Sequence, residues 1–316
     1  MTTEPAVEAI GLTKTYPGGV QAVRGLDFAV EPGEVFGLLG PSGAGKSTTV
    51  GIFTTTVKPT SGVARLAGYD VRKDPLRARS ISSVVFQEPV VDRGLTGREN
   101  LALHGRLWAV KDDQSRRRIN ELSEALGIEE QLDRPVESYS GGQRRRLEIA
   151  RALVSAPRVL FLDQQTVGLD PRIRHELLDV IGALRDRAGT TIVLTTHYLD
   201  EAERLCDRVA IVHLGEIVAL DSPRALLRGL GEQILEFQTH EEPHAVLAAL
   251  RREHVAGDDA FVIGARVTVP LHGRSASDAL AAIERAAAHA RDVTTRVPTL
   301  DDVYLQRTGA DLAEAA

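Results

Sequence analysis

The chain has 316 residues, enough for one large or two ordinary domains. Its formal net charge of -6 argues against an extended nucleic-acid surface, so we expect no nucleic-acid partner. No apolar run reaches about 18 residues and no signal-peptide pattern opens the sequence, so we expect a soluble protein that reaches a membrane only by docking. A single cysteine, Cys206, excludes an intrachain disulfide and is interpreted as a small hydrophobe within a helix.

The first 230 residues predict strands that alternate with helices. Residues 6–37 alternate or run apolar between the turn signals "PGG" and "EPGE", which predicts strands, and "VFGLLG" is typical of a buried parallel strand. Apolar spacing of three and four residues predicts two amphipathic helices between Thr96 and Leu126. The segments "RVLFLD" and "TTIVLTTH" are predicted buried strands, separated by a helix around Arg172–Arg187. This alternation indicates an α/β fold with a parallel sheet.

The C-terminal part predicts a separate small domain. Glycines in "LLRGLGEQ" indicate a linker, so we place a first domain at residues 5–230 and a second at 233–316. The second domain is predicted to be βαββαβ, a ferredoxin-like α+β order, with a short final helix in "TLDDVYLQRTG". Its predicted elements are the strand Ile234–Thr239, the helix Pro243–Glu253, a hairpin in "AFVIGARVTVPL", the helix Ser275–Ala290 and the strand Val293–Val297.

The segment "GPSGAGKST" predicts a phosphate-binding loop. It fits the pattern G-x-x-x-x-G-K-[ST] between a strand and a helix, the context that this motif requires. Its glycines allow backbone N–H groups to surround phosphates, and the helix N-terminus adds positive potential. We expect Lys46 to reach the β- and γ-phosphates and Ser47 to bind Mg²⁺. The predicted nucleotide-binding residues here are Gly40, Pro41, Ser42, Gly43, Ala44, Gly45, Lys46, Ser47 and Thr48.

A second motif, "YSGGQRRRLEIARAL", together with this loop closely resembles the ATP-binding-cassette (ABC) ATPases over about residues 7–228. The resemblance implies a P-loop NTPase cassette with a parallel core sheet, an antiparallel β subdomain and a helical subdomain at about 90–155. It also implies a head-to-tail dimer with a second copy, in which Ser140, Gly141, Gly142 and Gln143 contact ATP held by the other phosphate loop. The arginines 144–146 are interpreted as a solvated helix face, with a phosphate-binding role as the alternative.

The resemblance assigns roles to further positions, with ATP and Mg²⁺ as cofactors. Tyr16 in "KTYPGG" matches the aromatic residue that stacks on adenine, with a core tyrosine as the alternative. Gln87 matches the glutamine that meets Mg²⁺ and the attacking water, and Asp163 matches the aspartate that organises Mg²⁺. Asp170 matches the aspartate of the loop that crosses the dimer interface, and His197 matches the histidine bound to the γ-phosphate. The implied metal ligands are Ser47, Gln87 and Asp163.

Two residues depart from the family pattern, which has Glu and then Pro where this chain has Gln164 and Gln165. The second change is predicted to be mild. The first removes the general base, which contributes about 10²–10⁴-fold to a rate. We therefore expect catalysis through Gln164, His197, Gln87 and Asp163 to be slow, with ATP binding retained and the ATP-bound dimer prolonged. The matches at every other catalytic position favour an introduced glutamine over a natural one.

Three less specific motifs indicate a subfamily. The segments "VVFQEPVVDRGLTGRENL", "TVGLDPRIR" and "TLDDVYLQRTG" look like the daunorubicin-resistance type of drug-export cassette. This type implies efflux of drugs or lipids through separate integral-membrane permease chains, with the cassette held peripherally at the cytoplasmic face of the membrane. Two alternatives stay open: a soluble ABC protein of translation or repair, and a regulatory nucleotide switch, which Gln164 favours.

Overall fold

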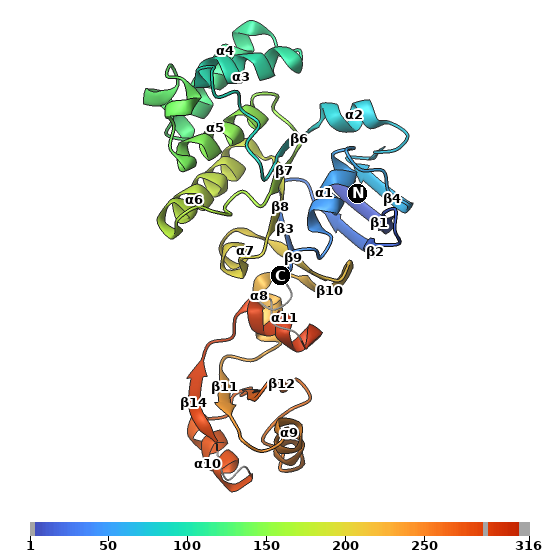
Figure 1. Cartoon of the computed structure of the whole chain (residues 1–316), viewed down its shortest axis with the longest axis vertical. Helices are drawn as coiled ribbons and strands as arrows, with labels where there is room; N and C mark the ends of the chain where they lie inside the picture. Colours follow the sequence, from blue (N-terminus) through green and yellow to red (C-terminus); the bar gives the residue numbers. More distant parts are fainter. Residues whose placement is uncertain (1–3, 287–289, 310–316) are drawn as a thin grey trace.

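The computed structural model describes residues 4–286 and 290–309. Figure 1 shows a cassette in the upper part, with a helical lobe on the left, an antiparallel sheet on the right and central strands between them. A smaller domain lies below the cassette, and helices α8 (Pro223–Arg228) and α11 (Leu300–Thr308) lie between the two. No helix in the described ranges is long and apolar enough to cross a bilayer.

A six-stranded sheet in the order β10-β9-β3-β8-β7-β6 forms the centre of the cassette. All neighbouring strands are parallel except β9 and β10. The strands β3, β7 and β8 are buried along their whole length, as the apolar runs predicted. The predicted α/β class is therefore confirmed. The bounds are β3 Val35–Leu39, β6 Ser82–Val85, β7 Val159–Asp163, β8 Thr191–Thr196, β9 Arg208–His213 and β10 Glu216–Asp221.

An antiparallel sheet in the order β2-β1-β4-β5 packs against one face of the central sheet through a shared core. Helix α1 (Lys46–Phe53) contributes to this core, where the Phe53 ring stacks on Phe161 of β7 at 6.0 Å between centroids. Helix α2 (Pro75–Ser80) follows the sheet. Its strands are β1 Val7–Thr15, β2 Gln21–Val30, β4 Ser61–Leu66 and β5 Tyr69–Asp70. The core fixes α1, and with it the phosphate loop, against the central strands.

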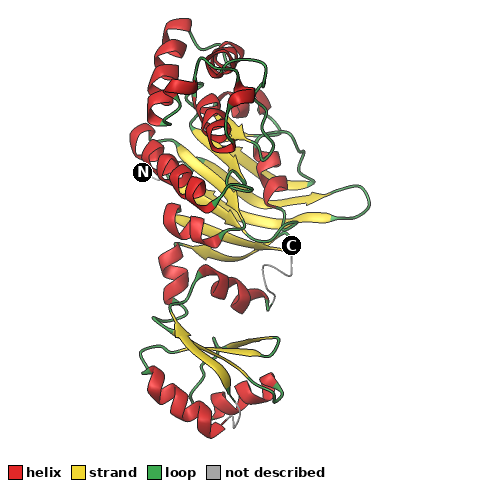
Figure 2. Cartoon of the chain, turned by 60° about the vertical axis from the view of Figure 1, so that its left-hand side comes forward, coloured by secondary structure: helices red, strands yellow, loops and turns green. Residues whose placement is uncertain are grey.

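The helical lobe contains the predicted amphipathic helices, α3 (Gly97–Leu107) and α4 (Asp112–Ala125), followed by α5 (Gly141–Leu153). Thr96 and Ser140 each cap the following helix, because the hydroxyl accepts a backbone N–H while the side chain three residues later binds the cap residue's own N–H. Helix α6 (Pro171–Ala188) and helix α7 (Leu199–Leu205) pack with α5 on the face of the central sheet opposite to the antiparallel sheet. Figure 2 shows helices lying over the central strands. Cys206 is buried directly after α7, one residue beyond the helix in which we expected it.

The small domain has the predicted βαββαβ order and a sheet in the order β12-β13-β11-β14, which is ferredoxin-like. Two helices cover it and enclose a separate apolar core. The described part of the predicted helix 275–290 is Ala276–Ala286, and residues 287–289 lie outside the described ranges. The bounds are β11 Ile234–Gln238, α9 Pro243–Arg252, β12 Phe261–Ile263, β13 Arg266–Pro270, α10 Ala276–Ala286 and β14 Arg291–Arg296.

The final helix, α11, leaves the small domain and packs on the cassette. Leu300, Val303 and Tyr304 are at most 3% exposed and join the core that contains α5, α6 and α7. The Tyr304 hydroxyl lies 2.8 Å from His213 Nδ1 at the end of β9. The last helix therefore joins both parts of the chain, a role that its sequence did not indicate.

Candidate active site

The loop between β3 and α1 curves through three glycines with positive φ: Gly40, Gly43 and Gly45. A Cβ atom at Gly40 would lie 2.2 Å from the Val212 carbonyl oxygen, and one at Gly45 would lie 2.2 Å from that of Ala22. These two positions require glycine because backbone carbonyls of β9 and β2 leave no room for a side chain. A Cβ atom at Gly43 would have nothing within 4 Å. The loop is therefore held tightly at both ends and leaves a concave space beside Gly43 that a phosphate group can fill.

Lys46 lies at the first position of α1 with only 3% of its surface exposed. Its Nζ donates to the carbonyl oxygens of Gly40 and Pro41 at 2.7 and 2.8 Å, so the side chain folds back over the loop. Burial lowers the pKa of Lys46 to about 8, and the Asp163 carboxylate opposes part of this shift. A buried cation held only by carbonyls is well placed to turn toward an anionic phosphate.

Asp163, the last residue of β7, binds side chains from α1 and β8 through one carboxylate oxygen. Its Oδ1 accepts hydrogen bonds from Ser47 Oγ at 3.1 Å and from Thr195 Oγ1 at 2.5 Å. One carboxylate beside one hydroxyl suits Mg²⁺, which takes few protein oxygens and completes its shell with water and phosphate. Ser47 and Asp163 therefore fit the metal predicted for them. Thr195 was not predicted, although the run of polar residues at the end of "IVLTTH" was a signal.

Gln164 follows Asp163 at the carboxyl end of β7, with φ of 51°. Its backbone N–H donates to both oxygen atoms of Thr195, the carbonyl at 3.2 Å and the hydroxyl at 3.1 Å. These bonds stabilise a left-handed conformation that is uncommon outside glycine, and the Gln164 side chain is half-buried. The amide can orient a water molecule but cannot accept its proton near neutral pH.

His197 follows β8, beside the same edge of the sheet. Burial lowers its pKa, and the positive charges of Lys46 and Arg174 lower it further, so the ring is neutral at pH 7. The imidazole packs on Tyr198 with 4.1 Å between ring centroids. The Arg174 guanidinium lies over the Tyr198 ring, 4.3 Å from its centroid. A neutral imidazole held in this way can donate a hydrogen bond to a phosphate oxygen. Arg174 was not predicted as part of this group.

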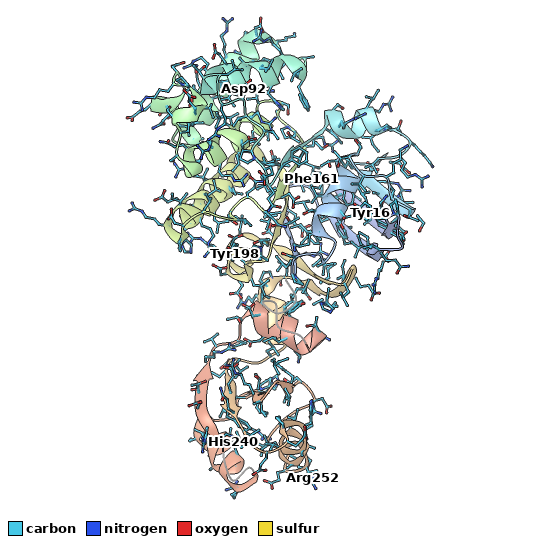
Figure 3. The ribbon with its side chains drawn as sticks, in the orientation of Figure 1. Tyr16, Asp92, Phe161, Tyr198, His240 and Arg252 are labelled. Carbon is cyan, nitrogen blue, oxygen red and sulfur yellow. The ribbon has the colours of Figure 1, made fainter. Side chains whose placement is uncertain are left out.

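Tyr16 borders the phosphate loop from the antiparallel sheet. Its hydroxyl lies 3.3 Å from Thr48 Oγ1, and Lys14 Nζ lies 4.9 Å from its ring centroid. Figure 3 shows Tyr16 on this sheet, to the right of the central strand that carries Phe161. The tyrosine is half-buried at the loop and is not a fully buried core residue.

Comparisons with known proteins agree with this geometry. The family model described as ABC transporter matches residues 23–167. The daunorubicin/doxorubicin resistance ATP-binding protein DrrA of Streptomyces peucetius is 41% identical over 98% of this chain and 94% of its own length. The linearmycin resistance ATP-binding protein LnrL of Bacillus subtilis is 32% identical over 98% of this chain and 100% of its own. The chain belongs to the ABC transporter family.

Solved structures support the same assignment. The cbiO1 subunit of an ABC transporter complex from Clostridium perfringens has a TM-score of 0.66 and 28% identity, and covers 72% of this chain and 94% of that one. An ATP-binding cassette solved as a dimer in a post-hydrolysis state, bound to ADP and Pi, has a TM-score of 0.62 and 28% identity. It covers 68% of this chain and 98% of that one. ABC cassettes in general hydrolyse ATP with Mg²⁺, and act as dimers with membrane permeases.

Within this ABC cassette, the signature turn does not join the phosphate loop of its own chain. Ser140 is exposed, and its hydroxyl caps α5 by accepting the Gln143 N–H at 3.2 Å. Asp170 is exposed as well, and its carboxylate accepts the Ile173 N–H at the start of α6. In the ranges that the structure describes, no hydrogen bond links residues 140–143 or Asp170 to residues 40–48. One copy of the ABC cassette therefore leaves these groups open.

The prediction for the arginines after the signature is wrong. Arg145 is 8% exposed, and its guanidinium donates to the carbonyl oxygens of Phe86 at 3.1 Å and Gln87 at 2.5 Å. Arg144 donates to the Tyr139 carbonyl, and Arg146 binds Glu176. All three side chains turn back onto the protein because each finds an acceptor outside α5, either a backbone carbonyl or a carboxylate.

Gln87 itself is exposed, on the loop after β6. The residues that hold this loop were not predicted as functional: Arg145 on the signature helix, and Gln165, whose amide reaches the same backbone. No local sequence signal marks either contact, because each joins segments that lie far apart in the chain of this ABC protein.

Proposed function

We propose that this protein is the ATP-binding and ATP-hydrolysing subunit of an ABC export complex that drives efflux of drugs or lipids through a separate permease. The observation that carries the proposal is the group formed by Lys46, Ser47 and Asp163 at the carboxyl ends of β3 and β7. DrrA and LnrL are drug-resistance ATP-binding proteins, and this supports export as the purpose of the present protein. The lining of the loop supports a nucleoside triphosphate as the fuel.

The proposed reaction is attack of water on the γ-phosphate of ATP, with ADP and phosphate as products. Lys46 leaves the Gly40 and Pro41 carbonyls to bind phosphate oxygens, and His197 donates to the γ-phosphate. Bound Mg²⁺, held through Ser47 and Asp163, would neutralise phosphate charge. Gln164 orients the attacking water. Since an amide cannot accept a proton, the proton of this water passes to a phosphate oxygen or to solvent. The step is therefore slow, and the ATP-bound state is long-lived.

A head-to-tail dimer is the proposed active form. Ser140 offers a hydroxyl, Gly141 and the buried Gly142 offer backbone N–H groups, and the α5 N-terminus supplies positive potential. Ser140 and Gly141 are exposed in one copy, which suits binding to the γ-phosphate on the loop of a second copy. The similar cassette that was solved with ADP and Pi is a dimer, which supports this arrangement.

The permease is proposed to dock on an apolar surface formed by Phe86, Val90, Leu103, Leu107 and Trp108 of the helical lobe and the loop before it. Each of these side chains is between 37% and 70% exposed. A hollow of about 350 Å³ lies among them, with Phe86, Val90, His104 and Trp108 in its lining. An apolar hollow next to Gln87 suits a helix of a membrane partner that holds the cassette at the cytoplasmic face of the membrane.

The test is the ATPase rate of Gln164→Glu in the complex purified with its membrane partner. A carboxylate at this position should raise the rate by about 10²-fold or more, with modest change in ATP affinity. The variant Lys46→Ala/Gln164→Glu is the matched control and should gain nothing. A fast rate with Gln164, or a slow one after Glu is installed, would refute this account.

A regulatory nucleotide switch is the second candidate, and Gln164 is the observation that favours it. A switch would bind ATP and dimerise, but would stay slow after Gln164→Glu. A six-helix membrane protein that copurifies with the chain distinguishes the exporter from the switch and from a soluble ABC protein.

A further inference from the structure

Gln165 stands where the family pattern has proline, and its side chain is 4% exposed. Its Nε2 lies 2.6 Å from the Val85 carbonyl oxygen, 3.0 Å from that of Phe86 and 3.0 Å from that of Asp163. One amide nitrogen has two hydrogens, so these three carbonyls share them. A proline side chain could make none of these bonds. The amide therefore ties the end of β7 to the start of the loop that carries Gln87.

Arg145 binds the same loop from the signature helix. Its guanidinium donates to the Phe86 and Gln87 carbonyls, and its Nη1 lies 3.4 Å from Gln165 Oε1. Both side chains are buried, so these bonds exchange little with water and an unmade one would be costly. Arg145 and Gln165 thus form one connected set of bonds around residues 85–87.

The signature helix also holds the far end of this loop. Glu148, one turn after Arg145 on α5, is 1% exposed, and its Oε1 accepts the N–H groups of Val90 and Val91 at 2.6 and 2.7 Å. Asp92, labelled in the helical lobe in Figure 3, then exchanges hydrogen bonds with Asn100. Between these bonded ends Gln87 keeps an exposed side chain, while its carbonyl oxygen accepts the bond from Arg145.

We propose that Arg145 and Gln165 are positioning residues that lock the backbone of Gln87 to the end of β7 and to the signature helix. Because of these bonds, a movement of α5 on dimer closure displaces the backbone of Gln87 by a similar amount. The inference rests on the proposed function for its catalytic consequence. Its structural content, an immobilised loop at residues 86–91, does not depend on hydrolysis.

The test is hydrogen–deuterium exchange of the nucleotide-free full chain, read on peptides that cover residues 86–91. Gln165→Met and Arg145→Met keep the length of the side chains and remove the donors. Each should speed exchange at Val90 and Val91 by about tenfold or more. Arg146→Met removes a charge at the next position of the same helix but no bond to the loop, and should leave this exchange unchanged.

The second measurement is the steady-state ATPase rate in the Gln164→Glu background, where turnover is fast enough to measure. The two methionine variants should lower kcat by about tenfold with little change in KM for ATP, and Arg145→Lys should restore part of the loss. Because both residues act on one loop, the double variant should lose little more than either single one.

Unchanged exchange at residues 86–91 in both single variants would overturn the proposal. So would losses of kcat that multiply in the double variant. If Arg145→Met fails to fold, Gln165→Met and Arg145→Lys decide the same question. Altered exchange without any ATPase activity in the complex would refute the proposed function and leave the lock in place.

Discussion

Gly40→Ala tests whether the phosphate loop is held as tightly as its contacts indicate. The new Cβ would lie 2.2 Å from the Val212 carbonyl oxygen and 3.3 Å from Ala44 Cβ, at a φ of 146°. The first distance is about 1 Å inside van der Waals contact, and the second partner, Ala44, is a buried residue of the loop itself. Overpacking costs about 1–3 kcal/mol, and an alanine in such a backbone region costs about 1–3 kcal/mol more. The unfolding free energy should therefore fall by about 2–6 kcal/mol.

Thermal and urea unfolding of the nucleotide-free chain measure this change, and the melting temperature should fall by about 5–20 °C. Gly43→Ala is the matched control, because its Cβ meets nothing within 4 Å and only the positive φ is strained. It should cost about 1–2 kcal/mol of stability yet weaken ATP binding by about tenfold or more, since its methyl group enters the phosphate cradle. Equal melting temperatures for wild type and Gly40→Ala would refute the reasoning.

Lys46→Ala should raise the Kd for ATP by about 10- to 100-fold while the fold is kept, because one charge-assisted bond to phosphate is lost. Since burial lowers the pKa of Lys46 to about 8, the free protein loses this charge above that pH. ATP affinity should thus decline from pH 8 upward in the wild type, and calorimetry should find no such slope in the variant. Ser140→Arg should abolish ATP-driven dimerisation by crowding the γ-phosphate site, whereas Ser140→Ala should retain it. A nucleotide-induced dimer of Ser140→Arg in sedimentation would contradict the head-to-tail arrangement.

Much of the cassette and its site could be predicted because the signals are local. Glycines at positions 40 and 45, followed by Lys46 and Ser47, encode a loop through backbone freedom and side-chain chemistry within a few residues. The apolar run before Asp163 placed that carboxylate at the end of a buried strand. Parallel strands bring their carboxyl ends to one edge, so Lys46, Asp163 and His197 meet there without any further information.

Contacts between distant segments were decided only by the tertiary structure. The run of three arginines was interpreted as a solvated helix face, yet the loop 58 residues before Arg145 supplies carbonyl acceptors that make its burial favourable. Gln165 in place of proline looked like a mild change, because the backbone acceptors of its amide are visible only once β6 lies beside β7. Likewise, nothing local in the sequence of α11 indicates a partner for Tyr304, and only the folded chain brings it to His213. Sequence patterns report the backbone preference and polarity of each residue, whereas its buried hydrogen-bond partners exist only after the chain has folded.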